Sequence, residues 1–308
     1  MKYAMLFPGQ GSQAVGMLSG LQAPGVAATF DEASAVLGWD VRKLVQDGPT
    51  EELNKTERTQ PALLAASIAV WRVWQTQNKP VPGAMAGHSL GEYSALVASG
   101  VLEFAEALKI VELRGQLMQA AVPVGTGGMV AVIGLDDEKV GELCKLYPGS
   151  EVLEPVNYNA PGQVVVAGQT AALDWLAANG KVNGARMVMK LPVSVPSHCS
   201  LMRQAADQLA ERLVQAKFHQ PVIPVLHNLD AQTRSEPDAI RQALKEQLYR
   251  PVRWTQTIQA LNAQGINLFL ECGPGKVLCG LGKRISSDTR NLPLEDSVGL
   301  QTALDSIS

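Results

Sequence analysis

One stretch decides the fold: Ala84-Met85-Ala86-Gly87-His88-Ser89-Leu90-Gly91-Glu92-Tyr93. It predicts a short strand over 84–86, a tight G-x-S-x-G turn over 87–91 and a helix from Glu92 to Ser99. In such a unit the strained turn lifts the serine hydroxyl clear of the backbone, and the flanking glycines make room for the turn. Ser89 would then lie at a helix N-terminus, where free N–H groups favour negative charge. Ser89 is therefore a candidate nucleophile, and the alternative is an incidental serine in a glycine-rich turn.

Strands and helices alternate on both sides of this unit. Three further strands are expected over Tyr3–Phe7, Val222–Leu226 and Asn267–Glu271. The expected helices are Gln60–Gln75 with Pro61 in its first turn, Phe104–Ala121, Leu201–Lys217, Asp238–Tyr249, Gln256–Gln264 and Lys276–Ile285. Such alternation is typical of a mainly parallel sheet between two layers of helices.

The pattern of expected elements changes after Pro123, where Gly125-Thr126-Gly127-Gly128 predicts a flexible connector. The elements expected after it follow the order β-α-β-β-α-β, which is the ferredoxin-like pattern. They are Met129–Leu135, Asp137–Leu146, Val152–Tyr158, Gln163–Gly168, Ala171–Ala178 and Ala185–Leu191. The sequence thus predicts an α/β fold with a small inserted domain over 123–192 and a discontinuous larger domain over 1–122 and 193–308.

Composition excludes several classes of protein. The 308 residues are 46% hydrophobic and 18% charged with a net charge of −3, which argues against disorder. No Lys/Arg run indicates a nucleic-acid or membrane-surface partner, and the longest apolar run, Pro61–Trp71, is too short to span a bilayer. The four cysteines form no C-x-x-C pair and no metal spacing, so we expect reduced thiols, no metal site and a cytoplasmic location.

A serine nucleophile needs a base, and the four histidines are the candidates. His88 precedes Ser89, so its side chain should project away from the hydroxyl, and nothing near His219 or His227 indicates a site. His198 lies in Val193-Ser194-Val195-Pro196-Ser197-His198, a loop between two predicted elements, where catalytic groups are common. His198 is the best candidate base; the alternative is a loop histidine that contacts the following helix.

Arg114 is the second informative residue. On the helix from Phe104 its neighbours three and four positions away are apolar, and the other charges lie on a different face. A guanidinium on the core side must find an anion or carbonyls. It is a candidate for bidentate binding of a substrate carboxylate. An internal ion pair or a side chain that reaches back to solvent is the alternative.

Two glycine-rich loops are weaker signals. Gly9-Gln10-Gly11-Ser12-Gln13 lacks the spacing of a nucleotide loop, so a loop that offers backbone N–H groups to the Ser89 pocket is an equally simple interpretation. Gly273-Pro274-Gly275-Lys276 opens a helix and is expected to be a turn.

Seven stretches, in this order, resemble the malonyl-CoA:acyl carrier protein transacylases of bacterial type II fatty acid synthesis. The stretches are Phe7-Pro8-Gly9-Gln10-Gly11-Ser12-Gln13, Thr59-Gln60-Pro61-Ala62-Leu63, Gly87-His88-Ser89-Leu90-Gly91-Glu92-Tyr93, Asn157-Tyr158-Asn159-Ala160-Pro161-Gly162-Gln163, Pro196-Ser197-His198, Gln247-Leu248-Tyr249 with Pro251-Val252 and Trp254, and Gly273-Pro274-Gly275. The resemblance extends over nearly the whole chain. The resemblance implies a hydrolase-like α/β domain with a ferredoxin-like insert.

The resemblance also implies roles. Ser89 matches the acylated nucleophile, His198 its base, and Gln247 the residue whose backbone carbonyl orients the histidine.

Arg114 matches the residue that holds the malonyl carboxylate. Gln10 and Leu90 match the backbone donors of the oxyanion hole, and Asn159 matches a residue close to the site. Ala160 stands where many relatives have serine.

The implied reaction transfers malonyl from malonyl-CoA to the phosphopantetheine thiol of holo-acyl carrier protein through a malonyl-serine, with ping-pong kinetics. No metal or other cofactor is implied, because CoA enters as part of the substrate. Neither nucleic acid nor a membrane is expected as a partner.

Three alternatives remain open. A serine esterase or thioesterase shares the elbow, but the acids near element ends between Ser89 and His198 are Asp136, Asp137 and Asp174, all in the predicted insert. A freestanding malonyl acyltransferase of a polyketide pathway would carry the same motifs. A non-catalytic binding protein is disfavoured by the intact candidate residues.

Overall fold

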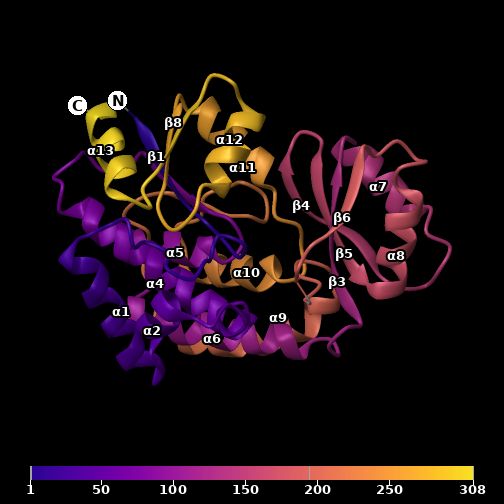
Figure 1. Cartoon of the computed structure of the whole chain (residues 1–308), viewed down its shortest axis with the longest axis horizontal. Helices are drawn as coiled ribbons and strands as arrows, with labels where there is room; N and C mark the ends of the chain where they lie inside the picture. The colour runs from indigo at the N-terminus through magenta and orange to yellow at the C-terminus, as the bar shows by residue number, and fades with distance from the viewer. Residues whose placement is uncertain (1, 194, 308) are drawn as a thin grey trace.

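The structure is a computed structural model that describes residues 2–193 and 195–307. Its elements, in chain order, are β1 (Tyr3–Phe7), α1 (Pro24–Leu37), α2 (Val41–Asp47), α3 (Thr50–Leu53), α4 (Thr56–Gln75), β2 (Ala84–Gly87), α5 (Gly91–Ala98), α6 (Phe104–Ala120), β3 (Gly127–Ile133), α7 (Asp137–Lys145), β4 (Leu153–Ala160), β5 (Gln163–Gln169), α8 (Thr170–Asn179), β6 (Met187–Lys190), the 3-10 helix η1 (Ser200–Met202), α9 (Arg203–Gln215), β7 (Val225–Leu226), α10 (Pro237–Gln247), α11 (Trp254–Ala263), β8 (Leu268–Glu271), α12 (Val277–Ile285), β9 (Arg290–Pro293) and α13 (Ser297–Ser306). Figure 1 shows the elements in place.

A five-stranded parallel sheet forms the centre of the larger part, with strand order β7-β2-β1-β8-β9. All five residues of β1 are buried, as expected of a strand that is covered on both faces. Because side chains alternate along a strand, Tyr3, Met5 and Phe7 face one hydrophobic cluster, and Ala4 and Leu6 face another.

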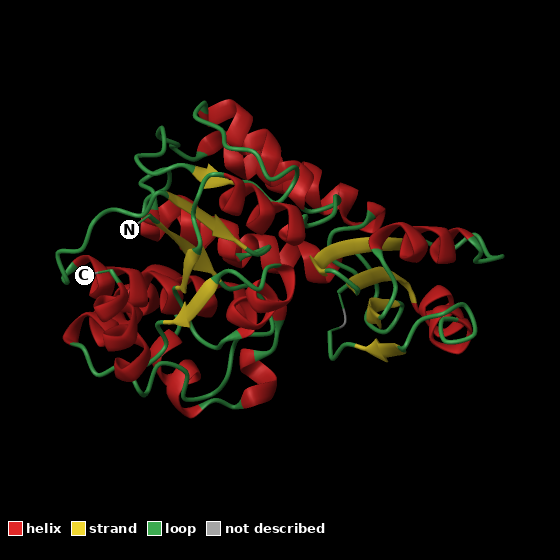
Figure 2. Cartoon of the chain, turned by 90° about the horizontal axis from the view of Figure 1, so that it is seen from above, coloured by secondary structure: helices red, strands yellow, loops and turns green. Residues whose placement is uncertain are grey.

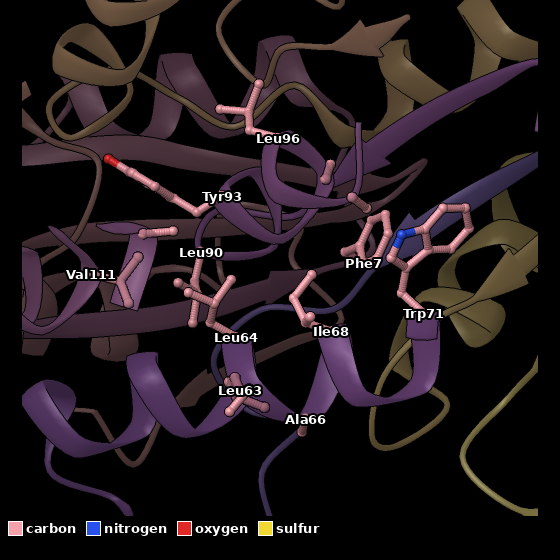
Figure 3. Packing of buried hydrophobic residues seen from close by; sticks show 14 of the residues in the cluster. Phe7, Leu63, Leu64, Ala66, Ile68, Trp71, Leu90, Tyr93, Leu96 and Val111 are labelled. Atoms are coloured by element: carbon pink, nitrogen blue, oxygen red, sulfur yellow. The ribbon is translucent and has the colours of Figure 1, made fainter. Parts of the chain in front are cut away.

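Helices pack on both faces of this sheet (Figure 2). Helices α11 and α12 supply the cluster with Ala4 and Leu6, whereas α4, α5 and α6 contribute to the larger cluster on the opposite face. Figure 3 shows Leu64, Ile68 and Trp71 of α4 pointing toward Phe7 and Leu90. The three-layer arrangement that the sequence predicts is confirmed.

The segment 127–190 forms a separate four-stranded antiparallel sheet of order β4-β5-β3-β6. Helices α7 and α8 pack on one of its faces through a cluster that includes Val130, Val132, Leu143 and Leu173. The order and pairing are those of the predicted ferredoxin-like unit, which Figure 1 shows beside the larger part.

The other face of the small sheet turns toward the larger part. Its residues pack with Cys199 just after the loop that leads back to the larger part. Main-chain bonds also join the two parts, because Val252 N donates to Val156 O at 2.8 Å and Tyr158 N donates to Val252 O at 3.0 Å. Strand β4 is therefore tied by its backbone to a segment of the larger part.

The bounds of several expected elements are wrong, and three cases are informative. Helix α4 begins at Thr56, so Pro61 lies inside the helix and leaves the Glu57 carbonyl without its usual donor. Strand β7 has only two residues, Val225–Leu226, instead of five. Gly127 belongs to β3 rather than to a flexible connector. Glycine is needed there, because a Cβ would lie 2.8 Å from Pro196 Cγ.

The four cysteines are unpaired and buried. Burial raises the pKa of Cys144 and Cys199 to about 12 and raises the pKa of Cys272 and Cys279 as well. Over the described ranges, no helix has the length and apolar character that crossing a membrane requires.

Candidate active site

Ser89 lies at the carboxyl edge of the parallel sheet, between β2 and α5. Its φ of 52° is in the left-handed region that side chains other than glycine rarely adopt. A Cβ on Gly87 would lie 1.9 Å from Gly91 C, and a Cβ on Gly91 would lie 2.1 Å from Phe7 O. Both glycines are therefore required by the turn, as the sequence predicts.

The turn is held by Asn228, which sequence analysis missed. Its Oδ1 accepts from Ser89 N at 2.6 Å, and its Nδ2 donates to Gly87 O at 2.6 Å. One amide thus spans both ends of the strained turn and satisfies the polar groups that the turn leaves unpaired.

His198 lies beside the nucleophile, with its Nε2 2.8 Å from Ser89 Oγ. Its Nδ1 lies 2.7 Å from the main-chain oxygen of Gln247. A carbonyl can only accept, so Nδ1 carries the proton and Nε2 is left free to accept from the serine. The geometry is that of a nucleophile and an oriented base, with a backbone carbonyl in place of a carboxylate.

The environment keeps this histidine neutral. Burial lowers the pKa of His198 to about 3, and the nearby Arg114 charge adds to that shift. His198 is 2% exposed. A neutral imidazole is the form that accepts a proton, so the base is available throughout the physiological pH range.

Arg114 projects from α6 to the same point. It is 1% exposed, as its position among apolar neighbours predicts. Its Nη2 lies 3.3 Å from Ser89 Oγ and 3.0 Å from Gln247 Oε1, and its Nη1 lies 2.7 Å from Gln60 Oε1. The internal ion pair considered from the sequence is absent, because no described carboxylate lies within 4.0 Å of the guanidinium.

Ser89, His198 and Arg114 line a cavity of about 100 Å³. Gln10 and Leu90 line it as well, and within the described residues neither main-chain N–H has an acceptor. The Gly9 loop approaches the turn closely, because a Cβ on Gly9 would lie 2.3 Å from His88 O. The opposite wall of the cavity comes from the small-sheet side and includes Met129, Asn157, Leu191 and Val193. Ser194, between Val193 and Val195 in the same loop, lies outside the described residues.

His88 and Asn159 form a second pair at the cavity. His88 Nε2 lies 2.8 Å from Asn159 Oδ1, and burial lowers the pKa of His88. Within the described residues, His88 has no bond to the serine hydroxyl, although it lines the same cavity. Asn159 is 9% exposed, and its contact with His88 places it close to the site.

A buried polar network behind the nucleophile was not predicted. Glu92 Oε1 lies 2.7 Å from His227 Nδ1, and Glu92 Oε2 accepts from Asn228 N at 2.9 Å and from Gln247 Nε2 at 2.9 Å. His227 does not line the cavity; it joins this network because strand β7 ends beside α5 and brings it to Glu92. Glu92 itself was signalled only by its place in the helix that follows Ser89.

Within residues 2–193 and 195–307, no cluster of three or more His, Cys, Asp or Glu side chains has a geometry that could hold a metal ion. The polar groups that line the cavity include the Ser89 hydroxyl, the His198 imidazole and the Arg114 guanidinium.

Comparison with known proteins identifies the family. The model of the acyl transferase domain matches residues 4–304. A malonyl CoA-acyl carrier protein transacylase of Salmonella typhimurium is 52% identical over 305 residues, 98% of this chain and 99% of the relative. The chain belongs to the malonyl CoA-acyl carrier protein transacylase family.

Solved structures agree with this family. An acyl carrier protein S-malonyltransferase from Vibrio cholerae is 54% identical and superposes with a TM-score of 0.96, covering 98% of this chain and 100% of that one. A malonyl-transacylase in complex with its holo type II PKS acyl-carrier protein is 52% identical with a TM-score of 0.98, covering 99% and 100%. The protein is thus an acyltransferase with the fold expected from its sequence.

Proposed function

We propose that this enzyme transfers the malonyl group from malonyl-CoA to the phosphopantetheine thiol of holo-acyl carrier protein, and so supplies fatty acid synthesis. The observation that carries the proposal is the position of Arg114, whose Nη2 lies 3.3 Å from Ser89 Oγ inside a buried cavity. A cation this close to the nucleophile favours an acyl group with a carboxylate near its thioester carbon.

In the first half-reaction, His198 Nε2 accepts the Ser89 proton as the serine oxygen bonds to the thioester carbon. The negative charge on the carbonyl oxygen is stabilised by the N–H groups of Leu90 and Gln10. Loss of one such donor typically costs about 10²–10³ in rate. The C–S bond then breaks, His198 returns the proton to the CoA sulfur, and malonyl-Ser89 remains.

In the second half-reaction, the thiol of the carrier protein replaces CoA. His198 accepts the thiol proton, the sulfur attacks the ester carbon, and the proton returns to Ser89 as the C–O bond breaks. The two substrates use the same base and the same oxyanion donors in turn, so the kinetics should be ping-pong.

Malonate chemistry matches the spacing of the site. One methylene separates the malonyl carboxylate from its thioester carbon, so a carboxylate on Arg114 leaves that carbon at the serine oxygen. An acetyl group would leave the buried guanidinium without an anion, and rejection of an analogue that leaves a buried polar group unpaired can reach about 10⁴–10⁵.

The proposed route uses groups of this chain and the two substrate thiols, without a metal or other cofactor. A cytoplasmic location is also proposed, and the support is that all four cysteines are unpaired. As acceptor we propose an acyl carrier protein, which the names of the relatives support.

The test is the intact mass of the protein after brief incubation with malonyl-CoA, followed by addition of holo-acyl carrier protein. We expect a malonyl-sized gain in the wild type that Ser89→Ala lacks and that the carrier protein removes. Steady CoA release without an adduct and without a carrier would instead indicate a thioesterase, and neither adduct nor release would indicate a binding protein.

A further inference from the structure

Gln247 contacts the site through two separate groups. Its main-chain oxygen accepts from His198 Nδ1 at 2.7 Å. Its side-chain Oε1 accepts from Arg114 Nη2 at 3.0 Å, and its Nε2 donates to Ser89 O at 3.0 Å and Glu92 Oε2 at 2.9 Å. The main-chain carbonyl of Gln247 thus contacts His198, whereas its side-chain amide contacts Arg114.

The surrounding groups allow only one orientation of this amide. The Ser89 carbonyl and the Glu92 carboxylate are acceptors, so both must face the NH₂ group. Arg114 has only donors, so it must face Oε1. The reversed amide would place a donor against the guanidinium and an acceptor against two oxygens, at the full cost of unpaired buried groups.

The second partner of Arg114 is also a neutral amide. Gln60 Oε1 accepts from Nη1 at 2.7 Å, and Gln60 is fully buried. The nearest negative charge in the network, on Glu92, reaches Arg114 only through the Gln247 amide and as a weaker Coulombic interaction across space. The guanidinium is therefore held in place without being neutralised by direct contact.

This arrangement has a chemical consequence. A carboxylate at position 247 would form a direct ion pair with Arg114 and compete with the carboxylate of an incoming acyl group. A neutral acceptor fixes the same donor and leaves the positive charge available. Gln247 does not itself line the cavity, so its side chain can affect the substrate only through the lining residues that it contacts, Arg114 and Ser89.

We propose that the side chain of Gln247 is a positioning residue that determines specificity for carboxylated acyl groups. Its Oε1 accepts from Arg114 outside the cavity, and Glu92 fixes the orientation of the Gln247 amide. The inference rests on the proposed function, in which Arg114 binds the malonyl carboxylate, and it assigns to the side chain a task separate from that of the carbonyl.

The decisive variant is Gln247→Met, which keeps the length of the side chain and the main-chain carbonyl but removes the amide. Single-turnover formation of acyl-Ser89 is measured against the concentrations of malonyl-CoA and acetyl-CoA. We expect the half-saturating malonyl-CoA concentration to rise about 10-fold or more, with a much smaller rise for acetyl-CoA and the same dependence of the rate on pH.

Gln247→Glu is the second variant. We expect it to lower malonyl-CoA use by about 10² or more and acetyl-CoA use less, because the new carboxylate pairs with Arg114, while the loss of the donor to Ser89 O and Glu92 affects both esters. Asn291→Leu is the matched control, since it replaces a buried amide with an apolar side chain in β9, away from the cavity. It should leave the ratio of the two esters unchanged.

Two results would overturn the inference. One is an unchanged half-saturating malonyl-CoA concentration in folded Gln247→Met. The other is an equal loss on both esters with a shifted acid limb, which would assign the side chain to His198 and Ser89. Arg114→Ala distinguishes a failure of the proposed function from a failure of this inference. If it leaves the ratio of the two esters unchanged, the proposed carboxylate site is wrong. If it changes the ratio while Gln247→Met does not, only this inference is wrong.

Discussion

Arg114 is a buried cation whose direct partners, Gln60, Gln247 and the Ser89 hydroxyl, are all neutral. Burial lowers its pKa, and a cation in such a place normally requires an anion. In the proposed function, the carboxylate of the substrate meets that requirement. Specificity would then depend on a charge that the chain holds in position but does not pair directly.

Arg114→Ala should abolish the preference for malonyl-CoA. Removal of one partner of a buried, hydrogen-bonded charge pair costs about 2–5 kcal/mol, so kcat/KM for malonyl-CoA should fall about 10²-fold or more. Acetyl-CoA should gain relative to malonyl-CoA, because it makes no use of the guanidinium. Competition between the two esters for acyl-Ser89, followed by mass, measures the ratio, and an unchanged ratio would contradict the assignment.

The lowered pKa of His198 predicts an unusual acid limb. An ordinary histidine, with a pKa near 6.5, would be about 90% protonated at pH 5.5 and would cost about 10-fold in rate. Because the pKa is lowered to about 3, protonation begins only at a much lower pH and the neutral base persists. The kcat/KM for acylation, which reports the free enzyme, should thus change less than about two-fold from pH 7.5 to 5.5. A half-maximal rate near pH 6.5 in protein that circular dichroism shows to be folded would refute the burial argument.

Much of the candidate site could be predicted from local sequence patterns. Ser89 was recognisable because a strand, two glycines and a helix stand in one continuous stretch, and Arg114 because helical spacing places it among apolar residues. The network of His227, Asn228 and Glu92 was not recognisable, since its contacts join positions about 135 residues apart and only Glu92 stands in a local motif. Tertiary packing alone brings the end of β7 to the start of α5.

The packing of helix α6 against helix α4 determines the position of Arg114. Gly115 follows Arg114 in α6, and a Cβ there would lie 2.6 Å from Glu57 Cα and 2.8 Å from Thr56 O of α4. The two backbones thus meet at the residue next to the guanidinium, and their spacing sets its reach into the cavity.

Gly115→Ala should push these helices apart. Overpacking costs about 1–3 kcal/mol, and we expect that loss in the free energy of unfolding measured with urea. The half-saturating malonyl-CoA concentration should rise more than that for acetyl-CoA. Gly141→Ala in α7 is the matched control: nothing lies within 4 Å of its Cβ, so helix propensity should stabilise it by about 0.5–1 kcal/mol. Equal stability of the two variants would show that the close approach is not required.

Element bounds were predictable where periodicity was strong, as in α6, and wrong where packing decided. Gly127 was assigned to a connector because glycine usually indicates flexibility, but here the absence of a Cβ lets β3 pass Pro196. Helix α13 and strand β9 were missed because the last residues carry little apolar periodicity. Only pairing with β8 makes the segment Arg290–Pro293 a strand.

The whole molecule places the cavity between two sheets. The larger part supplies Ser89, His198 and Arg114, and the small-sheet side supplies the opposite wall with Met129 and Asn157. The main-chain bonds of Val252 to Val156 and Tyr158 fix the distance between these walls. The geometry of the reaction thus depends on how the two parts are joined.

Val252→Pro should loosen this joint, because proline has no N–H to donate to Val156 O. A displacement of about 1 Å at a reacting centre can cost about 10² in rate, so kcat/KM should fall about 10-fold or more for malonyl-CoA and acetyl-CoA alike. Val252→Ala removes the side chain but keeps the amide and should retain most of the activity. A selective loss of malonyl-CoA, or equal losses in both variants, would contradict the role of the backbone bond.

The buried thiols have a practical consequence. With all four sulfurs enclosed and their pKa values raised, the natural chain should behave toward maleimide reagents almost as if it contained no cysteine. A single thiol introduced at an exposed position could therefore carry a fluorescent dye without removal of any native cysteine. Placed on the exposed strand β6, such a dye would mark the small sheet at one defined point.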